Sequence, residues 1–387
     1  MAGRWAAADQ ARRADRATLA RALVEARERT LRQFAAFEAA LGSGLRVPCT
    51  PELNLPLWEL GHVGWFADWW IARHTQRDRG IGADPQVPRN PSRLALRGLD
   101  ADALYNSSTV AHDTRWQLDL PPADAVRADL AAGLRDTLAL LQQATQNDEG
   151  LYFFRLALFH EDMHAEAAVY MAQTLGVDPG ESAHTGLVAP VVQPLHVPAT
   201  DWRLGHSGPG FAFDNELGAH TVHVNAFEID ARAVRWSQYL PLVEAGGAPT
   251  PRHLRHTPLG WEQQRFGHWR PLDPQAPACH LSAPEARAWC DWVGRRLPTE
   301  AEWEVAAHTL PGFAWGEVWE WTASAFAPYP GFQPHPYVDY SQPWFDGRPV
   351  LKGACAATVA RMRHPRYRNF FTAERNDIFA GFRSVAA

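Results

Sequence analysis

Apolar side chains recur at helical spacing through most of the first 180 residues of this chain. The pattern is carried by four stretches, residues 18–41, 55–72, 123–141 and 151–175. Apolar positions three and four residues apart fall on one face of a helix, and that face has to be buried against a neighbouring element. Four such helices in succession predict a helical bundle in residues 1–180.

The second and third stretches are joined by a long connection. It covers residues 73–122 and is rich in proline, glycine and arginine. Helices of a bundle are usually joined by only a few residues, and longer connections often belong to a functional site. We therefore expect this segment to be functional or to fold over the site.

The helical pattern stops at about Gly176, beyond which proline and glycine interrupt every long period. Alternating residues in HTVHVNAFEID, residues 220–230, predict strands. Residues 282–294 and 299–309 predict helices, because each begins with a Ser or Thr cap followed three residues later by Glu. The change of pattern predicts a second, mixed domain in residues 181–387 and an α+β protein.

The composition argues against several classes of partner. Lys and Arg number 37 against 43 Asp and Glu, a net charge of −6 without a basic tract, so no nucleic-acid partner is expected. No long uncharged apolar run is present, and the charged N-terminus lacks the pattern of a signal peptide, so no membrane span is expected. Four dispersed cysteines without a C-x-x-C pair favour a cytoplasmic location. The 17 tryptophans predict a site lined by aromatic rings.

Three histidines are the candidate metal ligands. His160 and His164 lie four residues apart in LALFHEDMHAEAAVYM and project from one face of the expected helix. Two imidazoles leave a metal site incomplete, and Glu166 lies about 200° around the helix from His164, so it points away. His62, in LWELGHVGWFADWW, is the best remaining candidate, because a buried imidazole needs a partner. Imidazole ligation suits zinc, copper or iron, so the spacing alone does not choose the metal.

Two other classes of function remain open on the residues alone. HEDMH matches the H-E-x-x-H pattern of zinc peptidases, in which Glu161 would be the general base of a zinc hydrolase. The extended pattern needs glycine and histidine where this chain has Ala167 and Tyr170, so a downstream glutamate such as Glu181 would have to complete the site. The third hypothesis is a non-enzymatic module that binds betaines or sugars.

The order of motifs along the chain resembles that of the ergothioneine-type sulfoxide synthases. The likeness runs from about residue 55 to residue 383 and adds to the histidines the motifs GRRLPTEAEWE, GEVWEWTASAFAPYPGF, VLKGACAA, RHPRYRNFF and NDIFAGFR. The resemblance implies a DinB-like four-helix bundle followed by a C-type-lectin-like domain related to formylglycine-generating enzymes. Formylglycine generation itself is not expected, because the cysteines show no paired arrangement.

The resemblance also implies the chemistry. It implies a mononuclear non-heme iron(II) ion held by three histidines, here His62, His160 and His164. With dioxygen, such enzymes attach sulfur or selenium to C-2 of the imidazole of hercynine, the trimethylated betaine of histidine. The segment RYRNFF implies that Asn369 and Phe370 contact the betaine end. Aromatic faces suit this substrate, because they can hold a permanent trimethylammonium cation.

Departures from the family pattern concern the second substrate. Relatives that use gamma-glutamylcysteine or cysteine carry arginines that bind the donor's carboxylates, whereas the matching run YNSSTVAHDTRWQLDLP has only Arg115. Met163 replaces a usual glutamine, Phe371 a usual aspartate, and GACA at 353–356 a usual G-G-S-C. These changes favour a less anionic donor. The chain looks most similar to the selenoneine synthase branch, which uses a selenosugar; gamma-glutamylcysteine or cysteine is the alternative donor.

A tyrosine is the expected proton donor near the dioxygen site, because its unperturbed pKa near 10 keeps it protonated at neutral pH. The aromatic second half offers Tyr329, Tyr337, Tyr340 and Tyr367, and the sequence does not choose among them. The sequence therefore predicts an iron-dependent oxidoreductase whose site lies between two domains.

Overall fold

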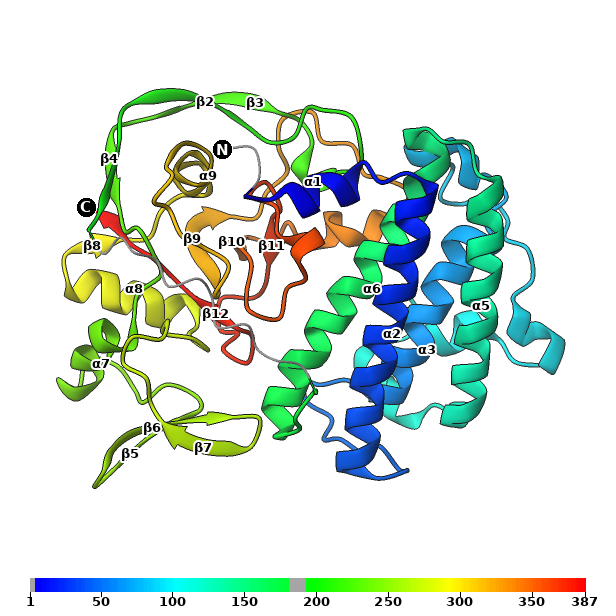
Figure 1. Cartoon of the computed structure of the whole chain (residues 1–387), viewed down its shortest axis with the longest axis horizontal. Coiled ribbons are helices and arrows are strands. Elements are labelled where there is room, and N and C mark those ends of the chain that lie inside the picture. Colours follow the sequence, from blue (N-terminus) through cyan, green and yellow to red (C-terminus); the bar gives the residue numbers. More distant parts are fainter. Residues whose placement is uncertain (1–3, 181–192) are drawn as a thin grey trace.

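The computed structural model describes residues 4–180 and 193–387, which form two parts packed side by side (Figure 1). Long helices make up one part, and short strands with a few helices make up the other. The expected domain boundary, between residues 180 and 181, falls where the described residues stop. Glu181, the glutamate that a zinc hydrolase would need, lies outside the described residues.

The four expected long helices are present and pack on one another. Their ends lie within a few residues of the expected ones, at α2 (Arg16–Leu41), α3 (Pro56–Ala67), α5 (Ala123–Gln143) and α6 (Asp148–Leu175). The prediction of a helical bundle before Gly176 is therefore confirmed by the described residues.

Side-chain caps explain where two of these helices begin. Asp15 accepts a hydrogen bond from the backbone of Thr18 at the start of α2, and Asn147 accepts one from Gly150 at the start of α6. Helix α6 ends at Gly176, which has a φ of 71°, a left-handed conformation that glycine adopts without strain. α6 is buried on nearly all sides because it lies between the other helices and the mixed part.

Two features of the helical part were not expected from the sequence. The last turns of the second stretch form a π-helix, η1 (Asp68–Ala72), and the chain opens with a short helix, α1 (Ala6–Arg12). The long connection between α3 and α5 contains short helices at η2 (Arg77–Gly82), η3 (Arg93–Arg97), α4 (Ala101–Tyr105) and η4 (His112–Gln117). Helix α4 packs against α3, so this connection is part of the folded helical body.

The mixed part holds two four-stranded sheets and two smaller ones among its described residues. The first sheet has the order β1 (Leu195–Val197), β4 (Phe227–Ile229), β13 (Val385–Ala386) and β8 (Arg295–Arg296). The second has the order β11 (Asn369–Phe370), β10 (Pro349–Gly353), β9 (Trp319–Ala325) and β12 (Ala380–Gly381). The smaller sheets pair β2 (Thr200–Leu204) with β3 (His220–Val224), and β5 (Leu254–Thr257) with β6 (Gly260–Arg265) and β7 (His268–Pro271).

The helices of this part include both that were expected from their caps. Ser282 and Thr299 cap α8 and α9, and each forms a capping box with the glutamate three residues on. These two helices are α8 (Ala283–Trp292) and α9 (Glu300–Thr309), and the others are α7 (Trp236–Glu244), η5 (Asp214–Glu216), η6 (Val338–Tyr340), η7 (Gln342–Trp344) and η8 (Ala360–Met362).

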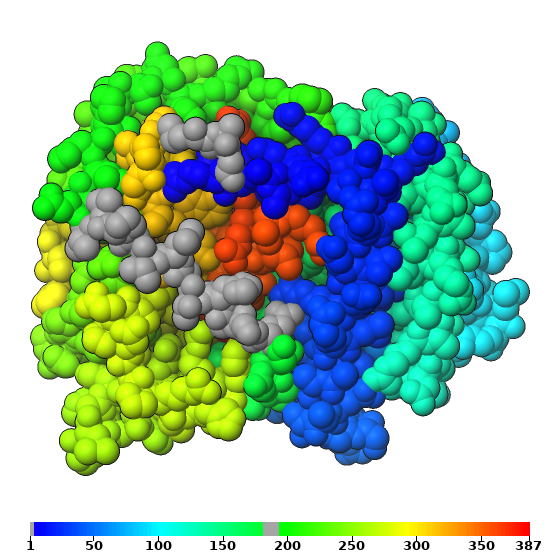
Figure 2. All heavy atoms as spheres, viewed as in Figure 1, coloured from blue at the N-terminus to red at the C-terminus, as the bar shows by residue number. Residues whose placement is uncertain are grey.

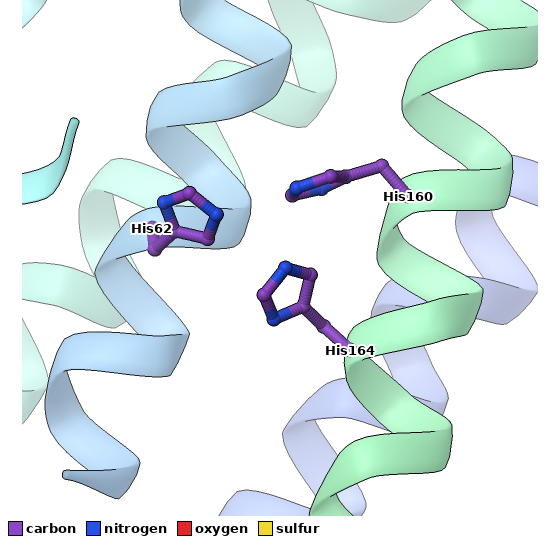
Figure 3. Close-up of side chains that lie close together, drawn as sticks. All are labelled: His62, His160 and His164. Atoms are coloured by element: carbon purple, nitrogen blue, oxygen red, sulfur yellow. The ribbon is translucent and has the colours of Figure 1, made fainter. Parts of the chain in front are cut away.

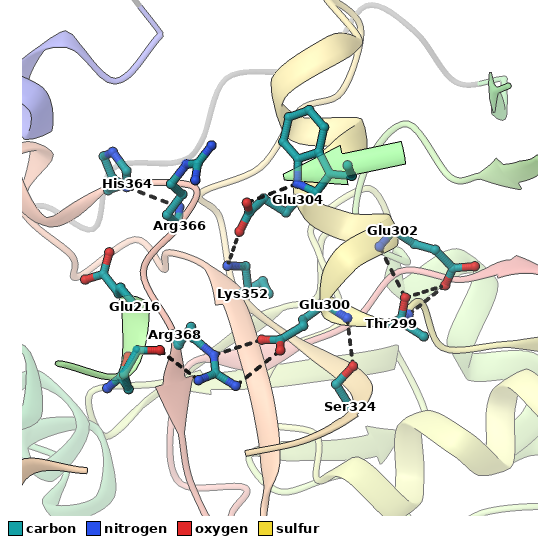
Figure 4. A network of polar contacts seen from close by, with 12 residues as sticks. Glu216, Thr299, Glu300, Glu302, Glu304, Ser324, Lys352, His364, Arg366 and Arg368 are labelled. Atoms are coloured by element: carbon teal, nitrogen blue, oxygen red, sulfur yellow. Dashed lines mark hydrogen bonds and ion pairs between the residues drawn. The ribbon is translucent and has the colours of Figure 1, made fainter. Parts of the chain in front are cut away.

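A buried charged network fixes the edge strand β11. Arg368, directly before Asn369, is fully buried and donates to both carboxylate oxygens of Glu300, at 3.0 and 3.2 Å (Figure 4). Lys352 of the neighbouring strand β10 pairs with Glu304 at 3.3 Å. Because β11 pairs with β10 through Leu351 and Asn369, the network holds the Asn369 segment in one position.

The two parts share one hydrophobic core, which includes Phe159 of α6 and Trp319 of β9. Helix α1 crosses from the bundle to the mixed part and packs on η8. Figure 2 shows the dark-blue N-terminal residues bordering the orange-red residues of the mixed part. The large shared core predicts that the two parts hold a fixed orientation, with α6 and β9 forming the contact between them.

Within the described ranges, none of the helices combines the length and the apolar character needed to cross a bilayer.

Candidate metal centre and adjoining cavity

Three imidazole rings converge between α3 and α6 (Figure 3). His62 comes from α3, and His160 and His164 come from successive turns of α6. One ring nitrogen from each residue can be chosen so that all three lie within 4.8 Å of one another. Metal–nitrogen bonds near 2 Å place three ligands of a single ion about 3–4 Å apart, so the rings lie slightly wider than a bound ion would hold them.

Hydrogen bonds at the outer nitrogens orient two of the rings. His62 Nδ1 lies 2.8 Å from the backbone oxygen of Tyr105, and His164 Nδ1 lies 2.5 Å from Oε2 of Glu59. Both acceptors require Nδ1 to carry the proton, so Nε2 of each ring keeps a lone pair. Such outer partners are the usual means of orienting a metal-binding histidine.

His160 has no comparable partner. Both of its ring nitrogens are buried without a hydrogen bond in the described chain, and the ring stacks on Phe66 with centroids 3.5 Å apart. Burial and the neighbouring His164 and His62 rings hold its pKa well below the usual value. A neutral, unpaired imidazole in this position is costly unless another group accepts its lone pair, and a metal ion would do so.

Burial and the neighbouring His164 lower the pKa of His62 to about 3, so this ring also stays neutral at pH 7. Burial alone would raise the pKa of Glu59, but His164 and the side-chain amide of Asn54, which also donates to Glu59, bring it to about 2. The site therefore holds two neutral imidazoles, His62 and His160, and an ionised carboxylate that contacts the third ring, His164. Neutral imidazole is the form that binds a metal.

We expect Glu59→Gln to weaken metal binding about 10–100-fold, because a weaker hydrogen-bond acceptor would orient and polarise His164 less well. Anaerobic titration of the metal-free protein with Fe(II) measures the affinity. Glu28→Gln is the matched control, since Glu28 is an exposed carboxylate on α2. Equal affinity in the Glu59 variant and the wild type would show that this contact does not support the site.

The glutamate of HEDMH does not face the three rings. Glu161 accepts hydrogen bonds from Arg27 at 2.8 and 3.1 Å and from the hydroxyl of Thr30 at 2.9 Å, all on α2. A carboxylate held in a buried ion pair with arginine is not placed to act as a general base at the histidines. The geometry gives no support to the zinc hydrolase hypothesis.

Glu166 also points away from the rings, as its position on the helix predicts. Its Oε1 accepts a hydrogen bond from Trp319 Nε1 at 2.6 Å and another from the hydroxyl of Tyr170. The carboxylate therefore faces the mixed part, at the junction of α6 and β9.

A cavity of about 340 Å³ lies at this junction. Asn369 and Phe370, the expected substrate contacts, are both on its wall, although the Phe370 ring stacks on Phe326 with centroids 4.1 Å apart. Glu59 also lines the cavity and contacts His164, so one wall of this space touches a residue that orients a candidate metal ligand. Other lining side chains are Asn54, Met163, Glu166, Tyr340, Tyr367 and Arg375.

The structure separates the four tyrosines. Tyr340 and Tyr367 line the cavity with their hydroxyls 3.1 Å apart, and both lie near the sulfur of Met163. The ring of Tyr337 packs on Phe66, close to His160 but behind the stacked ring. Tyr329 packs against Arg368 elsewhere in the mixed part. Only the first two are placed to meet a molecule in the cavity.

Arg115 does not line the cavity. Its guanidinium lies 3.7 Å from the centroid of Trp58, whose other neighbour is the stacked ring of His62 at 4.7 Å. Arg375 does line it, but its Nε and one terminal nitrogen, Nη2, donate to Asp377, at 2.5 and 2.6 Å. Sequence reasoning missed the supporting residues of the site, although Glu59 is three residues before His62 and so on the same helix face.

Comparisons with known proteins agree with this architecture. Residues 189–314 match the sulfatase-modifying factor enzyme 1-like domain. Hercynine oxygenase of Mycolicibacterium smegmatis is 29% identical over 95% of this chain and 98% of its own length, and that of Mycobacterium tuberculosis is 28% identical over 93% and 96%. The formylglycine-generating enzyme of Streptomyces coelicolor is 32% identical, but over only 32% of this chain and 50% of its own.

A helical part with convergent imidazoles, joined to a sulfatase-modifying-factor-like domain, places the chain among the oxygen-dependent oxidoreductases. The relatives described above that match nearly the full length of both chains are hercynine oxygenases. Over nearly its full length the chain is similar to hercynine oxygenases, at 28–29% identity.

Proposed function

We propose that this chain is a non-heme iron enzyme that uses dioxygen to join a chalcogen atom to C-2 of the hercynine imidazole. The observation that carries the proposal is the convergence of three imidazoles, of which His160 has no other partner among the described residues. The names of the full-length relatives support hercynine and oxygen as substrates.

The proposed ligands are His62, His160 and His164. Three protein ligands leave vacant coordination positions, and bound iron would supply the one-electron chemistry with dioxygen that joining a chalcogen to an unactivated carbon requires. In the sulfoxide or selenoxide stoichiometry, the C2–H and chalcogen–H bonds break and a carbon–chalcogen bond forms. Dioxygen then takes four electrons, leaving one oxygen atom on the chalcogen and releasing the other as water with the two hydrogens.

We further propose that residues 1–180 are a DinB-like bundle that holds the metal, and that residues 181–387 are a C-type-lectin-like domain that forms the substrate walls. The 340 Å³ cavity between α6 and β11 is the proposed substrate site. Four free cysteines accord with a cytoplasmic location.

The cavity suits a trimethylammonium betaine. The Glu166 carboxylate supplies a negative charge, and the rings of Tyr340, Tyr367 and Phe370 supply aromatic faces for a cation that cannot donate a hydrogen bond. The Asn369 side-chain amide supplies a donor for the substrate carboxylate. Burial raises the pKa of both tyrosines, so their hydroxyls stay protonated and can donate a proton at neutral pH.

Charge pairing at the cavity favours a donor without carboxylates. Arg375 is already bound to Asp377, and Arg252 donates to both oxygens of Glu52 at 2.9 Å. A donor with two carboxylates would have to compete with Asp377 or Glu52 for these arginines. We therefore propose a selenosugar as the donor, which makes the enzyme a selenoneine synthase; gamma-glutamylcysteine or cysteine is the alternative.

The test is incubation of the iron-loaded protein with hercynine and dioxygen together with a selenosugar, gamma-glutamylcysteine or cysteine, with the products identified by mass. We expect a hercynine–selenium adduct with the selenosugar. An adduct with only a thiol would assign the donor to sulfur. No consumption of hercynine with any donor would refute the function, and parallel reactions under argon test the need for dioxygen.

A further inference from the structure

A second, smaller cavity lies in the helical part, between α2, α3 and α6, and is partly open to the surface. It has a volume of about 40 Å³ and is lined mainly by apolar side chains, among them Phe34, Phe37, Val63 and Ala168. At one end it meets Glu59 and His164. The cavity therefore adjoins the candidate metal centre but is walled by the bundle alone.

The polar groups on this wall are bonded to other protein groups. The amide of Gln33 donates to the backbone oxygen of Ala165 at 2.8 Å, and the hydroxyl of Thr30 is within 2.9 Å of Glu161. The Glu59 carboxylate receives hydrogen bonds from Asn54 and His164. A buried water needs two to four polar partners, so an apolar cavity whose polar groups are already paired is expected to stay dry.

The two cavities use different faces of α6. The small one contacts residues 164, 165 and 168, whereas the large one contacts 163, 166, 167 and 170, and Met171 borders both. Residues three and four apart share a helix face, so these sets point to opposite sides of α6. A molecule in the small cavity can approach His164 while the large cavity is filled by organic substrates.

We propose that the small cavity is a binding site for dioxygen on its way to the metal centre; this inference rests on the proposed function. Dioxygen is small, apolar and without hydrogen-bonding demands, so it is stable in a dry cavity that water avoids. Its entry through the bundle keeps its route separate from the sites of hercynine and the chalcogen donor. The Ala168 methyl group, on the helix turn after His164, is a wall of this route.

Crystals of the full chain pressurised with xenon provide a probe that does not depend on turnover. We expect xenon in the cavity of the wild type, less xenon in Ala168→Leu, which fills the space, and more in Phe37→Leu, which enlarges it. Ala131→Leu is the matched control, because Ala131 is exposed on α5. No xenon in the wild-type cavity would overturn the inference.

The second measurement is the rate at which nitric oxide, a diatomic substitute for dioxygen, binds the iron-loaded protein. We expect Ala168→Leu to slow it about tenfold, to raise KM for dioxygen correspondingly, and to leave KM for hercynine unchanged. If Ala168→Leu folds poorly, Phe37→Leu still decides the test, because it enlarges the cavity and should change the same rates in the opposite direction.

Two results separate this inference from the proposed function. Normal hercynine turnover together with unchanged nitric oxide rates in Ala168→Leu would remove the dioxygen route and leave the function standing. Xenon binding that responds to both variants, in a protein that consumes no oxygen with hercynine and any donor, would refute the function and the dioxygen role while leaving a site for apolar gas.

Discussion

His62→Ala and His160→Ala proteins are expected to purify with less than about a tenth of an equivalent of iron and without hercynine turnover, because the two remaining imidazoles hold an open site poorly. His160 is the sharper case. Both of its nitrogens lack another partner in the described chain, so it has no evident role except as a ligand. Metal quantification after anaerobic purification measures the first result, and hercynine consumption the second.

The control for these variants is Glu166→Ala. Glu166 follows His164 by two residues and is buried, but its carboxylate binds Trp319 and Tyr170 on the far side of the helix. This variant should therefore keep its iron, whatever it does to substrate binding. Iron loss in Glu166→Ala, or full iron in His160→Ala, would show that the ligand set is wrong.

Arg12→Ala is expected to destabilise the protein by about 3–5 kcal/mol, because it leaves the carboxylate of Glu216 buried and unpaired. In the wild type, Arg12 of α1 donates to both oxygens of Glu216 at 2.7 and 2.9 Å, with the carboxylate fully buried. This pair joins the N-terminal helix to the mixed part. Urea unfolding of the full chain measures the loss.

Two further variants distinguish the loss of the Arg12–Glu216 ion pair from the effect of removing any arginine. Arg255→Ala removes an arginine from an ion pair with Glu262 in which the arginine is 48% exposed, and should cost only about 0–1 kcal/mol. Arg12→Met combined with Glu216→Leu removes both charges and should recover most of the stability lost in Arg12→Ala. A small loss in Arg12→Ala, or no recovery in the double variant, would contradict the assignment.

The same pair has a defined pH dependence. Burial would raise the pKa of Glu216, but Arg12 brings it down from 4.5 to about 2 in the folded protein. A folded pKa below the unfolded one stabilises the protein above pH 4.5, and this contribution is lost as the pH falls toward 2. The difference in unfolding free energy between the wild type and Arg12→Ala should therefore shrink across that acid range.

The sequence predicted the local features of the fold well. Helical periodicity located the four long helices, and the Ser282 and Thr299 caps located α8 and α9. The four-residue spacing of His160 and His164 placed them on one face, and the same geometry turned Glu166 away. Each of these features involves residues within one or two helical turns of one another, so the geometry of the helix backbone is enough to predict it.

Other roles were decided only by the tertiary structure. Glu161 fits a peptidase motif, yet it binds Arg27 on another helix. Of the four candidate tyrosines, only Tyr340 and Tyr367 line the large cavity. Arg115 packs on Trp58 instead of lining that cavity. Each of these contacts joins groups far apart in the chain. The sequence by itself determined which faces the helices bury and where the histidines project, because periodicity encodes direction along one element. Which side chains contact those histidines and helix faces was decided by packing between elements, because only the folded chain brings side chains that are distant in the sequence within bonding distance.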